Sequence, residues 1–561
     1  MCKANRVMLA VVLAMALPCT ALAAETDLQA KLDNLTRQMD ELQGQVQRIE
    51  SKSLGKWLQI GGSYQFRMDS LHGETATYTN AMDTFNNLAN YIVANPAAVG
   101  APDSFSAYQA VVQLQTNMTA VKNLTEAQNF LAGYGPLIQS LLTAHPELAA
   151  YTAAYRPKNE TMYTNKFALD LHAKATQDVT VNVKLNMYKV FGNQDDKAVN
   201  GDANFADRTG IFDGTLGHVP SNSYLNVDRA YATWSNIMDQ PVWFSVGRRP
   251  ATDGAPTNLK SNSARPGNGG TPALLVNYAF DGMTLGYAPD IDMLPGFYTK
   301  VCYGRAFESG YRNNPTNSLK DTDMLGVAVI PVDTDPLRVW LQWNRGFNIF
   351  DFPAMNNTKF GNTAPSVNLG SIDWFGTGVM STLKQVGAGD LNFFVDAGVN
   401  LVHPTSAVSG NAMFQGLLTG SPFRPEAPSD KTGYAVFAGL RYDLPSKTKL
   451  GFEFNYGTKN WIPFDPSADD MWTSKLGTRG RVYEPYIIQE LNLKPISSFF
   501  AKAFFKLGYQ FYDFDYTGSN NWVGAPIKIS DLASYQASGG MLLQAPIKTA
   551  HDIYGTFEVH F

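Results

Sequence analysis

Apolar and polar residues alternate with a period of two along most of the chain. The alternation is clear in WLQIGGSYQFRM at 57–68, in VTVNVKLNMY at 179–188 and in LRVWLQWN at 337–344. It recurs in DLNFFVDAGV at 390–399 and in KLGFEFNY at 449–456. Because successive side chains of a β-strand point to opposite faces, each segment predicts a strand with one apolar face and one polar face.

The same pattern predicts about 16 strands, within a range of about 14 to 18. They are expected at 57–68, 163–175, 179–190, 223–237, 241–249, 272–288, 297–307, 322–332, 337–346, 371–384, 390–403, 432–444, 447–459, 481–494, 498–514 and 551–561.

The connectors between these strands alternate between long and short. The long ones are at 69–162, 191–222, 250–271, 308–321, 347–370, 404–431, 460–480 and 515–550. Outer-membrane barrels have short periplasmic turns and long extracellular loops, whereas a soluble sandwich has no reason to sort its connectors. A sheet can cross lipid only if it closes on itself. We therefore predict an all-β fold, a transmembrane antiparallel β-barrel at 56–561 with an aqueous lumen.

The first long connector, at 69–162, is rich in Ala, Leu and Gln and predicts helices near 105–124 and 127–155. A helical first extracellular loop leaves three arrangements open. The loop folds inward as a constriction or lid, projects outward as a docking surface, or caps the barrel passively.

Two further segments are predicted before the barrel. A signal peptide is predicted at 1–24, because a basic start is followed by the apolar run VMLAVVLAMAL and by the small residues Ala21-Leu22-Ala23. Lipid modification at Cys19 is the less favoured alternative. Residues 25–52 predict a periplasmic coiled-coil segment, and a lone amphipathic helix is the alternative. Its heptad seam consists of Leu28, Leu32, Leu35, Met39, Leu42, Val46 and Ile49.

The final segment, HDIYGTFEVHF at 551–561, is itself an amphipathic strand. Phe557, Val559 and Phe561 fall on its apolar face, which we expect to meet lipid, while Glu558 and His560 fall on the other face. Pairing of this strand with the strand at 57–68 would remove the last free edge of the sheet. The C-terminal segment is therefore predicted to close the barrel.

The composition favours a membrane protein over a cytosolic enzyme. Charged residues make up 17% of the chain and aromatic residues 12%, against about 25% charged in an average soluble domain. The net charge is -5, and no run of Lys or Arg resembles a nucleic-acid patch. After signal cleavage Cys302 is the one remaining cysteine, which excludes an intramolecular disulfide.

The sequence offers little chemistry of the enzymatic kind. It contains no CxxCH motif for covalent c-type haem, no metal-ligand spacing among its His residues and no GxSxG motif in a strand-turn-helix context. We therefore expect no cofactor, no metal and no catalytic residues. A barrel hydrolase is the least favoured alternative.

Basic residues on the predicted polar faces and near strand ends are candidates for the pore lining or mouth. Together with acidic residues such as Glu453 and Glu490 they indicate a weak anion preference, since rings of charge set the selectivity of pores. For the stretch that contains Arg248, Arg249, Lys260 and Arg265, pinning of the loop by salt bridges is favoured over attraction of anions to the pore mouth. The basic candidates are Arg67, Lys184, Arg248, Arg249, Lys260, Arg338, Arg441, Lys502 and Lys506.

The signal peptide, heptad helix, alternating strands and terminal Phe561 together resemble Gram-negative outer-membrane porins over nearly the whole chain. In that family a C-terminal strand that ends in Phe is read by the barrel assembly machinery. The stretch SVGRRPATDGAPTNLK at 245–260 and the helical first loop are similar to a porin-like family of metal-reducing bacteria.

Two functions from different classes follow. The first is a porin in the cell outer membrane, in contact with outer-membrane lipid, that passes small hydrophilic solutes or ions passively and forms a homo-oligomer such as a trimer. The alternative is a structural barrel that sheathes multihaem cytochromes in a porin-cytochrome electron-transfer conduit. Neither function involves nucleic acid.

Overall fold

The computed structural model describes residues 57–192, 223–251, 254–263, 274–311, 319–358, 361–466, 469–492 and 502–561. The predicted signal peptide and coiled-coil segment lie outside these residues and stay predictions. Residues Ile60–Phe561 form one compact unit.

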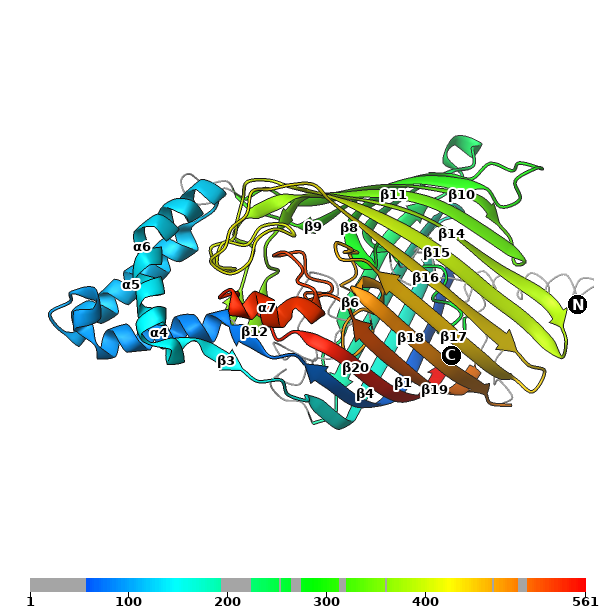
Figure 1. The fold of residues 1–561 in the computed structure, drawn as a ribbon. Coiled ribbons are helices and arrows are strands. Elements are labelled where there is room, and N and C mark those ends of the chain that lie inside the picture. The colour runs from blue at the N-terminus through cyan, green and yellow to red at the C-terminus, as the bar shows by residue number, and fades with distance from the viewer. Residues whose placement is uncertain are drawn as a thin grey trace, which may run out of the picture. The chain divides into compact units, whose positions relative to one another are not determined.

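Within the described residues, sixteen strands form a closed antiparallel barrel in which strand order follows the chain, as the alternation predicts (Figure 1). Their bounds are β1 Leu58–Thr75, β4 Lys158–Lys174, β5 Val179–Val190, β6 Asn226–Trp234, β7 Val242–Ala251, β8 Tyr278–Tyr287, β9 Tyr298–Phe307, β10 Thr322–Asp333, β11 Leu337–Phe350, β14 Asn368–Val386, β15 Gly389–Pro404, β16 Lys431–Asp443, β17 Thr448–Gly457, β18 Gly480–Glu490, β19 Lys502–Phe514 and β20 Ile547–His560.

The alternation of long and short connectors is also confirmed. Residues 387–388 alone join β14 to β15, whereas residues 405–430 join β15 to β16. Because neighbouring strands run in opposite directions, the long connectors all emerge at one end of the barrel, here called the long-connector end.

The C-terminal strand closes the ring, as predicted. β20 pairs antiparallel with β1, and Phe557 lies opposite Phe66. Beyond the strand, Phe561 N donates to Gly62 O at 3.0 Å and Gly62 N donates to Phe561 O at 2.8 Å. On the other side of β1, Tyr64 Oη donates to Asn165 Oδ1 of β4 at 2.7 Å. Both seams of β1 are thus bonded.

The two faces of the wall differ as the alternation predicts. Apolar side chains on the outer face are exposed, among them Ile60, Met68, Leu341, Val395, Phe452, Leu507 and Ile553. Polar side chains on the inner face are buried, among them Arg67, Gln342, Asn392, Glu453, Lys506 and Asp552. Some inner positions are nevertheless apolar, because connectors pack against them, and these include Leu71, Tyr188, Trp374, Phe394 and Phe437.

The connector between β1 and β4 is helical, as predicted, and it contains three helices. Side chains of Asn80, Asp103 and Asn123 cap the helix N-termini by accepting backbone N–H bonds. Its elements are β2 Tyr78–Asn80, α4 Ala81–Ala94, η1 Pro96–Val99, α5 Ser104–Ala120, α6 Leu124–Ala144, η2 Pro146–Leu148 and β3 Ala150–Thr152.

These helices lie beyond the strands at the long-connector end (Figure 1). Phe85 of α4, Met118 of α5 and Phe130 of α6 share an apolar cluster with Met413 and Phe414 of the β15–β16 connector. Among the three arrangements left open by the sequence, this contact fits a cap that packs on the other connectors.

The remaining elements lie in connectors. They are η5 Ile237–Asp239, β12 Met355–Thr358, β13 Gly361–Thr363, η6 Lys475–Gly477, η7 Ile529–Asp531 and α7 Leu532–Ala537. None of the helices in the described ranges combines the length and the apolar character that a membrane-spanning helix needs.

Candidate functional site: the barrel interior

The connector between β7 and β8 crosses the barrel interior. In the ring of sixteen strands, β17 lies eight strands from β7 in either direction. Residues 254–263 of the connector reach that opposite wall. Arg441 Nη1 on β16 donates to Leu259 O at 2.6 Å, and Lys260 Nζ lies 2.5 Å from Glu484 Oε1 on β18. This segment, here called the crossing connector, therefore spans the lumen.

Asn262 anchors the crossing connector to the opposite wall. Its Nδ2 donates to Glu490 Oε1 at 2.9 Å, and its Oδ1 accepts from Lys449 Nζ at 2.5 Å. Its backbone oxygen accepts from Lys502 Nζ. Asn262 has a φ of 56°, a left-handed conformation that Asn adopts more readily than most residues. Three strands thus hold one connector residue.

Glu484 is the centre of a buried ionic network. Its carboxylate accepts from Lys260 and Lys475 at 2.5 Å each and from Tyr554 Oη at 2.7 Å. Lys475, in the β17–β18 connector, also pairs with Glu453. Burial alone would lower the pKa of Lys475, but the neighbouring carboxylates outweigh burial and raise this pKa well above its ordinary value. Lys475 therefore stays charged inside the barrel.

The network continues through Tyr554 to β1. The Arg67 guanidinium carbon lies 4.6 Å from the centroid of the Tyr554 ring, and Lys260 Nζ lies 5.4 Å from it. Arg67 in turn pairs with Asp69 at 2.7 Å and with Asp552 at 2.9 Å. Both cations are attracted to the electron-rich ring, so charge and aromatic contacts join the crossing connector to the closing strands.

Next to this polar network, connectors fill the interior with apolar side chains. Trp374 on β14 donates its Nε1–H to Ile462 O of the β17–β18 connector at 2.6 Å. Phe464 stacks on Trp522 of the β19–β20 connector with centroids 6.1 Å apart. A Cβ added at Gly398 on the wall would lie 2.7 Å from the Trp461 ring. The sequence predicted a lumen left to water, whereas at this level the described residues pack a core inside the barrel.

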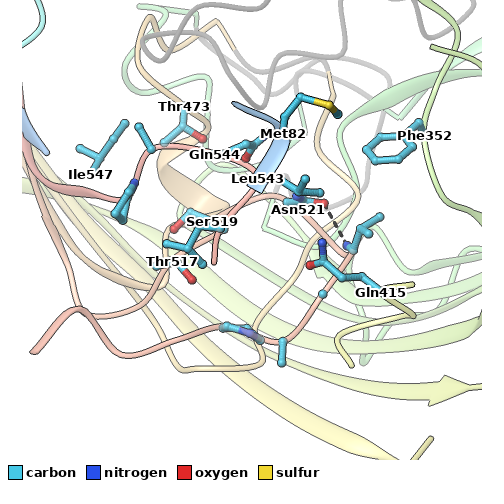
Figure 2. A pocket seen from close by; sticks show the side chains of 18 of the residues that line it. Met82, Phe352, Gln415, Thr473, Thr517, Ser519, Asn521, Leu543, Gln544 and Ile547 are labelled. Atoms are coloured by element: carbon cyan, nitrogen blue, oxygen red, sulfur yellow. Dashed lines mark hydrogen bonds between the residues drawn. The ribbon is translucent and has the colours of Figure 1, made fainter. Parts of the chain in front are cut away.

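A cavity of about 300 Å³ lies at the long-connector end, between the helical cap and the connectors beneath it (Figure 2). Met82 comes from α4, Phe352 from the β11–β14 connector and Gln415 from the β15–β16 connector. Residues of the β17–β18 and β19–β20 connectors complete the lining, among them Trp472, Thr473, Arg479, Thr517, Ser519, Asn521 and Gln544.

Five predicted lining residues meet in the polar network or at the crossing connector. Arg67, Lys260, Arg441 and Lys502 make the contacts given above, and Arg441 also pairs with Asp443 at 2.7 Å. Lys506 pairs with Glu558 at 2.8 Å and donates to Lys260 O at 3.3 Å. All five bind carboxylates, carbonyls or rings.

The other four basic candidates lie apart from the network. Arg248 pairs with Asp281 at 2.8 Å, and Arg338 pairs with Asp333. Arg249 donates to Thr284 Oγ1 and lies over Trp243. Lys184 on β5 faces Asp170 and Arg229 in register.

The sequence prediction missed five members of the network: Asp69, Lys475, Glu484, Asp552 and Tyr554. Asp552 and Tyr554 alternate with the apolar residues of HDIYGTFEVHF and so share the polar face of the predicted closing strand with Glu558 and His560, but no role was predicted for them. Glu484 is an acid within a predicted strand, which was an available signal. Lys475 lies in a connector without periodicity, so no pattern placed it inside the barrel.

The fold and its interior define a class, a closed sixteen-stranded antiparallel barrel whose long connectors fold into the lumen and cover one end. The chain belongs to the family described as "Protein of unknown function (DUF3373)", whose model matches residues 156–561. No curated protein sequence matches the chain.

Several solved outer-membrane proteins are similar in structure at low identity. OprB of Pseudomonas putida is 10% identical, with 91% of this chain and 96% of that chain covered and a TM-score of 0.39. The anion-selective porin from Comamonas acidovorans is 9% identical, with 90% and 100% covered and a TM-score of 0.36. OmpT of Vibrio cholerae in its trimer form is 11% identical, also with 90% and 100% covered and a TM-score of 0.36. No conclusion about this chain rests on these likenesses.

Proposed function

We propose that this protein is a porin of the Gram-negative outer membrane that passes small hydrophilic solutes or ions by passive diffusion. The observation that carries the proposal is the closed barrel with an apolar outer face and a polar, ion-paired inner face. Lipid satisfies no backbone hydrogen bond, so a closed ring is the form in which a sheet crosses a membrane. The N-terminal segment would then lie in the periplasm, as would the short connectors.

The contacts of the basic candidates support at most a weak anion preference. Arg67, Arg338, Arg441 and Lys506 each pair with a carboxylate, and a paired cation adds little positive field. Arg248 and Lys260, for which the sequence favoured a pinning role, pair with Asp281 and Glu484, and these contacts support that role.

The crossing connector also bears on the alternative function. A sheath for multihaem cytochromes needs an interior wide enough to admit a protein partner. Contacts of Leu259, Lys260 and Asn262 with the opposite wall divide that interior, which favours small solutes. We keep the resemblance to porin-like proteins of metal-reducing bacteria as part of the proposal. The proposal does not include a cytochrome partner.

Conductance in planar bilayers tests the proposal. Purified full-length protein should give stepwise, salt-dependent currents, and a KCl gradient should give a small reversal potential of the anion-selective sign. Folded protein that inserts without conducting would contradict the open-pore function. We also propose a homo-oligomer, such as a trimer, and light scattering in detergent would measure its mass.

A further inference from the structure

We propose that the cavity beneath the helical cap binds an uncharged solute that carries hydroxyl groups on an apolar or aromatic body. This inference deepens the proposed function and rests on it, because the cavity lies at the end of the barrel through which a solute would enter. The inference identifies the class of solute that would bind in the cavity before it enters the barrel.

The lining contains almost no charge. In a chain with 17% charged residues, Arg479 is the one charged residue among the described residues that border the cavity. Its guanidinium is already used, since Nε donates to Trp461 O at 3.0 Å and Nη2 donates to Asn521 O at 2.8 Å. Nη1 donates to Thr517 O at 3.1 Å and to Gly518 O at 2.6 Å. Arg479 thus holds the connectors together and has little capacity left for an anion.

The remaining lining combines apolar surfaces with neutral polar groups. Met82, Phe352 and Trp472 supply apolar and aromatic surface. Gln544 makes no side-chain hydrogen bond to any described residue, and Figure 2 shows it among the residues around the cavity. Its amide can both donate and accept, which suits a hydroxyl group.

The size and the electrostatics of the cavity indicate which solutes of this class would bind. Its volume of about 300 Å³ lies at the small end of ligand pockets, which span roughly 300 to 1,000 Å³. An anion would lose its hydration in the cavity, and Arg479, which already donates to four backbone carbonyls, has little capacity to replace that hydration. A neutral glycoside with an aromatic ring therefore fits better than an organic phosphate of equal length.

A matched pair of probes tests the inference on the full-length protein in detergent. Binding of 4-nitrophenyl glucoside and of 4-nitrophenyl phosphate would be measured by calorimetry. The glucoside should bind, and the phosphate should bind at least about tenfold more weakly. No binding of the glucoside at millimolar concentration, or equal binding of the two probes, would overturn the inference.

Two substitutions on α5 locate the site. Thr119 lines the cavity and is exposed, so Thr119→Trp should fill the cavity and weaken glucoside binding about tenfold. Thr116 is also exposed on α5 but does not line the cavity, so Thr116→Trp should leave binding unchanged. Equal affinities for these two variants would contradict the location. Gln544→Leu is a second test that leaves the helical cap intact, and it should weaken binding as well.

The conductance and binding experiments can contradict the porin function and the proposed binding site separately. A protein that conducts but does not bind the glucoside keeps the porin function and loses this inference. A protein that binds the glucoside but does not conduct keeps the site and loses the porin function.

Discussion

The Lys475 ammonium is buried between Glu453 and Glu484. Because of this position, the free energy of unfolding should fall when the pH becomes alkaline enough to deprotonate Lys475. The folded protein raises the pKa of Lys475 well above its ordinary value, which is about 10.4 in an unfolded chain. The stabilisation is therefore complete below about pH 10.4 and is lost as pH rises toward the higher folded pKa. Lys475→Arg should flatten this alkaline loss, because Arg stays protonated.

Thermal unfolding followed by tryptophan fluorescence between about pH 8 and pH 11.5 measures this effect. Lys384→Arg is the control, since Lys384 is 72% exposed and pairs with Asp390 at the β14–β15 turn. The control should keep the alkaline slope of the natural protein. Identical slopes for Lys475→Arg and the natural protein would show that Lys475 does not supply the dependence.

Sequence alone placed several charged side chains inside the barrel but did not pair them. Arg67 lies on the polar face of an alternating strand, so its inward direction could be predicted. Its partner Asp552 is 485 residues away along the chain, and the two meet because β20 pairs with β1 in a particular register. Periodicity gives the face of a side chain, whereas register across the closing seam gives its partner.

The crossing connector should control the width of the conducting path. Lys260→Ala combined with Asn262→Ala removes the contacts with Glu484, Glu490 and Lys449. Glu484 keeps Lys475 as a counter-ion, so the barrel should still fold. We expect a larger single-channel conductance with more frequent switching, because the connector then moves within the lumen.

Bilayer recordings of the double variant measure the conductance directly. Lys384→Ala removes an exposed cation that pairs with Asp390 rather than with the crossing connector, and it should leave conductance unchanged. A double variant with the conductance of the natural protein would mean that the connector does not limit the path.

The helical cap depends on Phe414, which is fully buried and packs against Phe130 with ring centroids 5.1 Å apart. Phe414→Ala leaves a cavity in this contact, and such truncations cost about 3 to 5 kcal/mol. The cap should then loosen and become sensitive to limited proteolysis within α4–α6, while the barrel stays resistant. Phe105→Ala changes a residue that is 68% exposed, and its proteolysis pattern should match that of the natural protein.

Strand positions were more predictable than the ends of strands and the paths of connectors. The first strand was predicted to end at residue 68, but β1 continues to Thr75. The extension was missed because Leu71 is an apolar residue on the inner face, where it joins Trp472 in an apolar cluster. Likewise, the sequence considered an inward fold for the β1–β4 connector, whereas the β7–β8 connector crosses the lumen. Such paths are decided by contacts as distant as Arg441 with Leu259, 182 residues apart.

Closure of the barrel depends on a close approach at Gly62, where β1 meets both of its neighbours. A Cβ added there would lie 2.4 Å from Ala168 O on β4 and 2.8 Å from the Phe561 ring. The backbone oxygen cannot rotate away as a side chain does, so Gly62→Val should force β1 away from β4. An opened seam would expose unpaired backbone groups to lipid, which costs several kcal/mol for each group. The variant should therefore yield less of the compact, heat-modifiable form on gels after refolding.

Gly133→Ala is the matched control, because a Cβ there meets nothing within 4 Å and Ala favours the helix by about 1 kcal/mol over Gly. If Gly62→Val refolds as completely as Gly133→Ala, close packing at this seam is not what closes the ring.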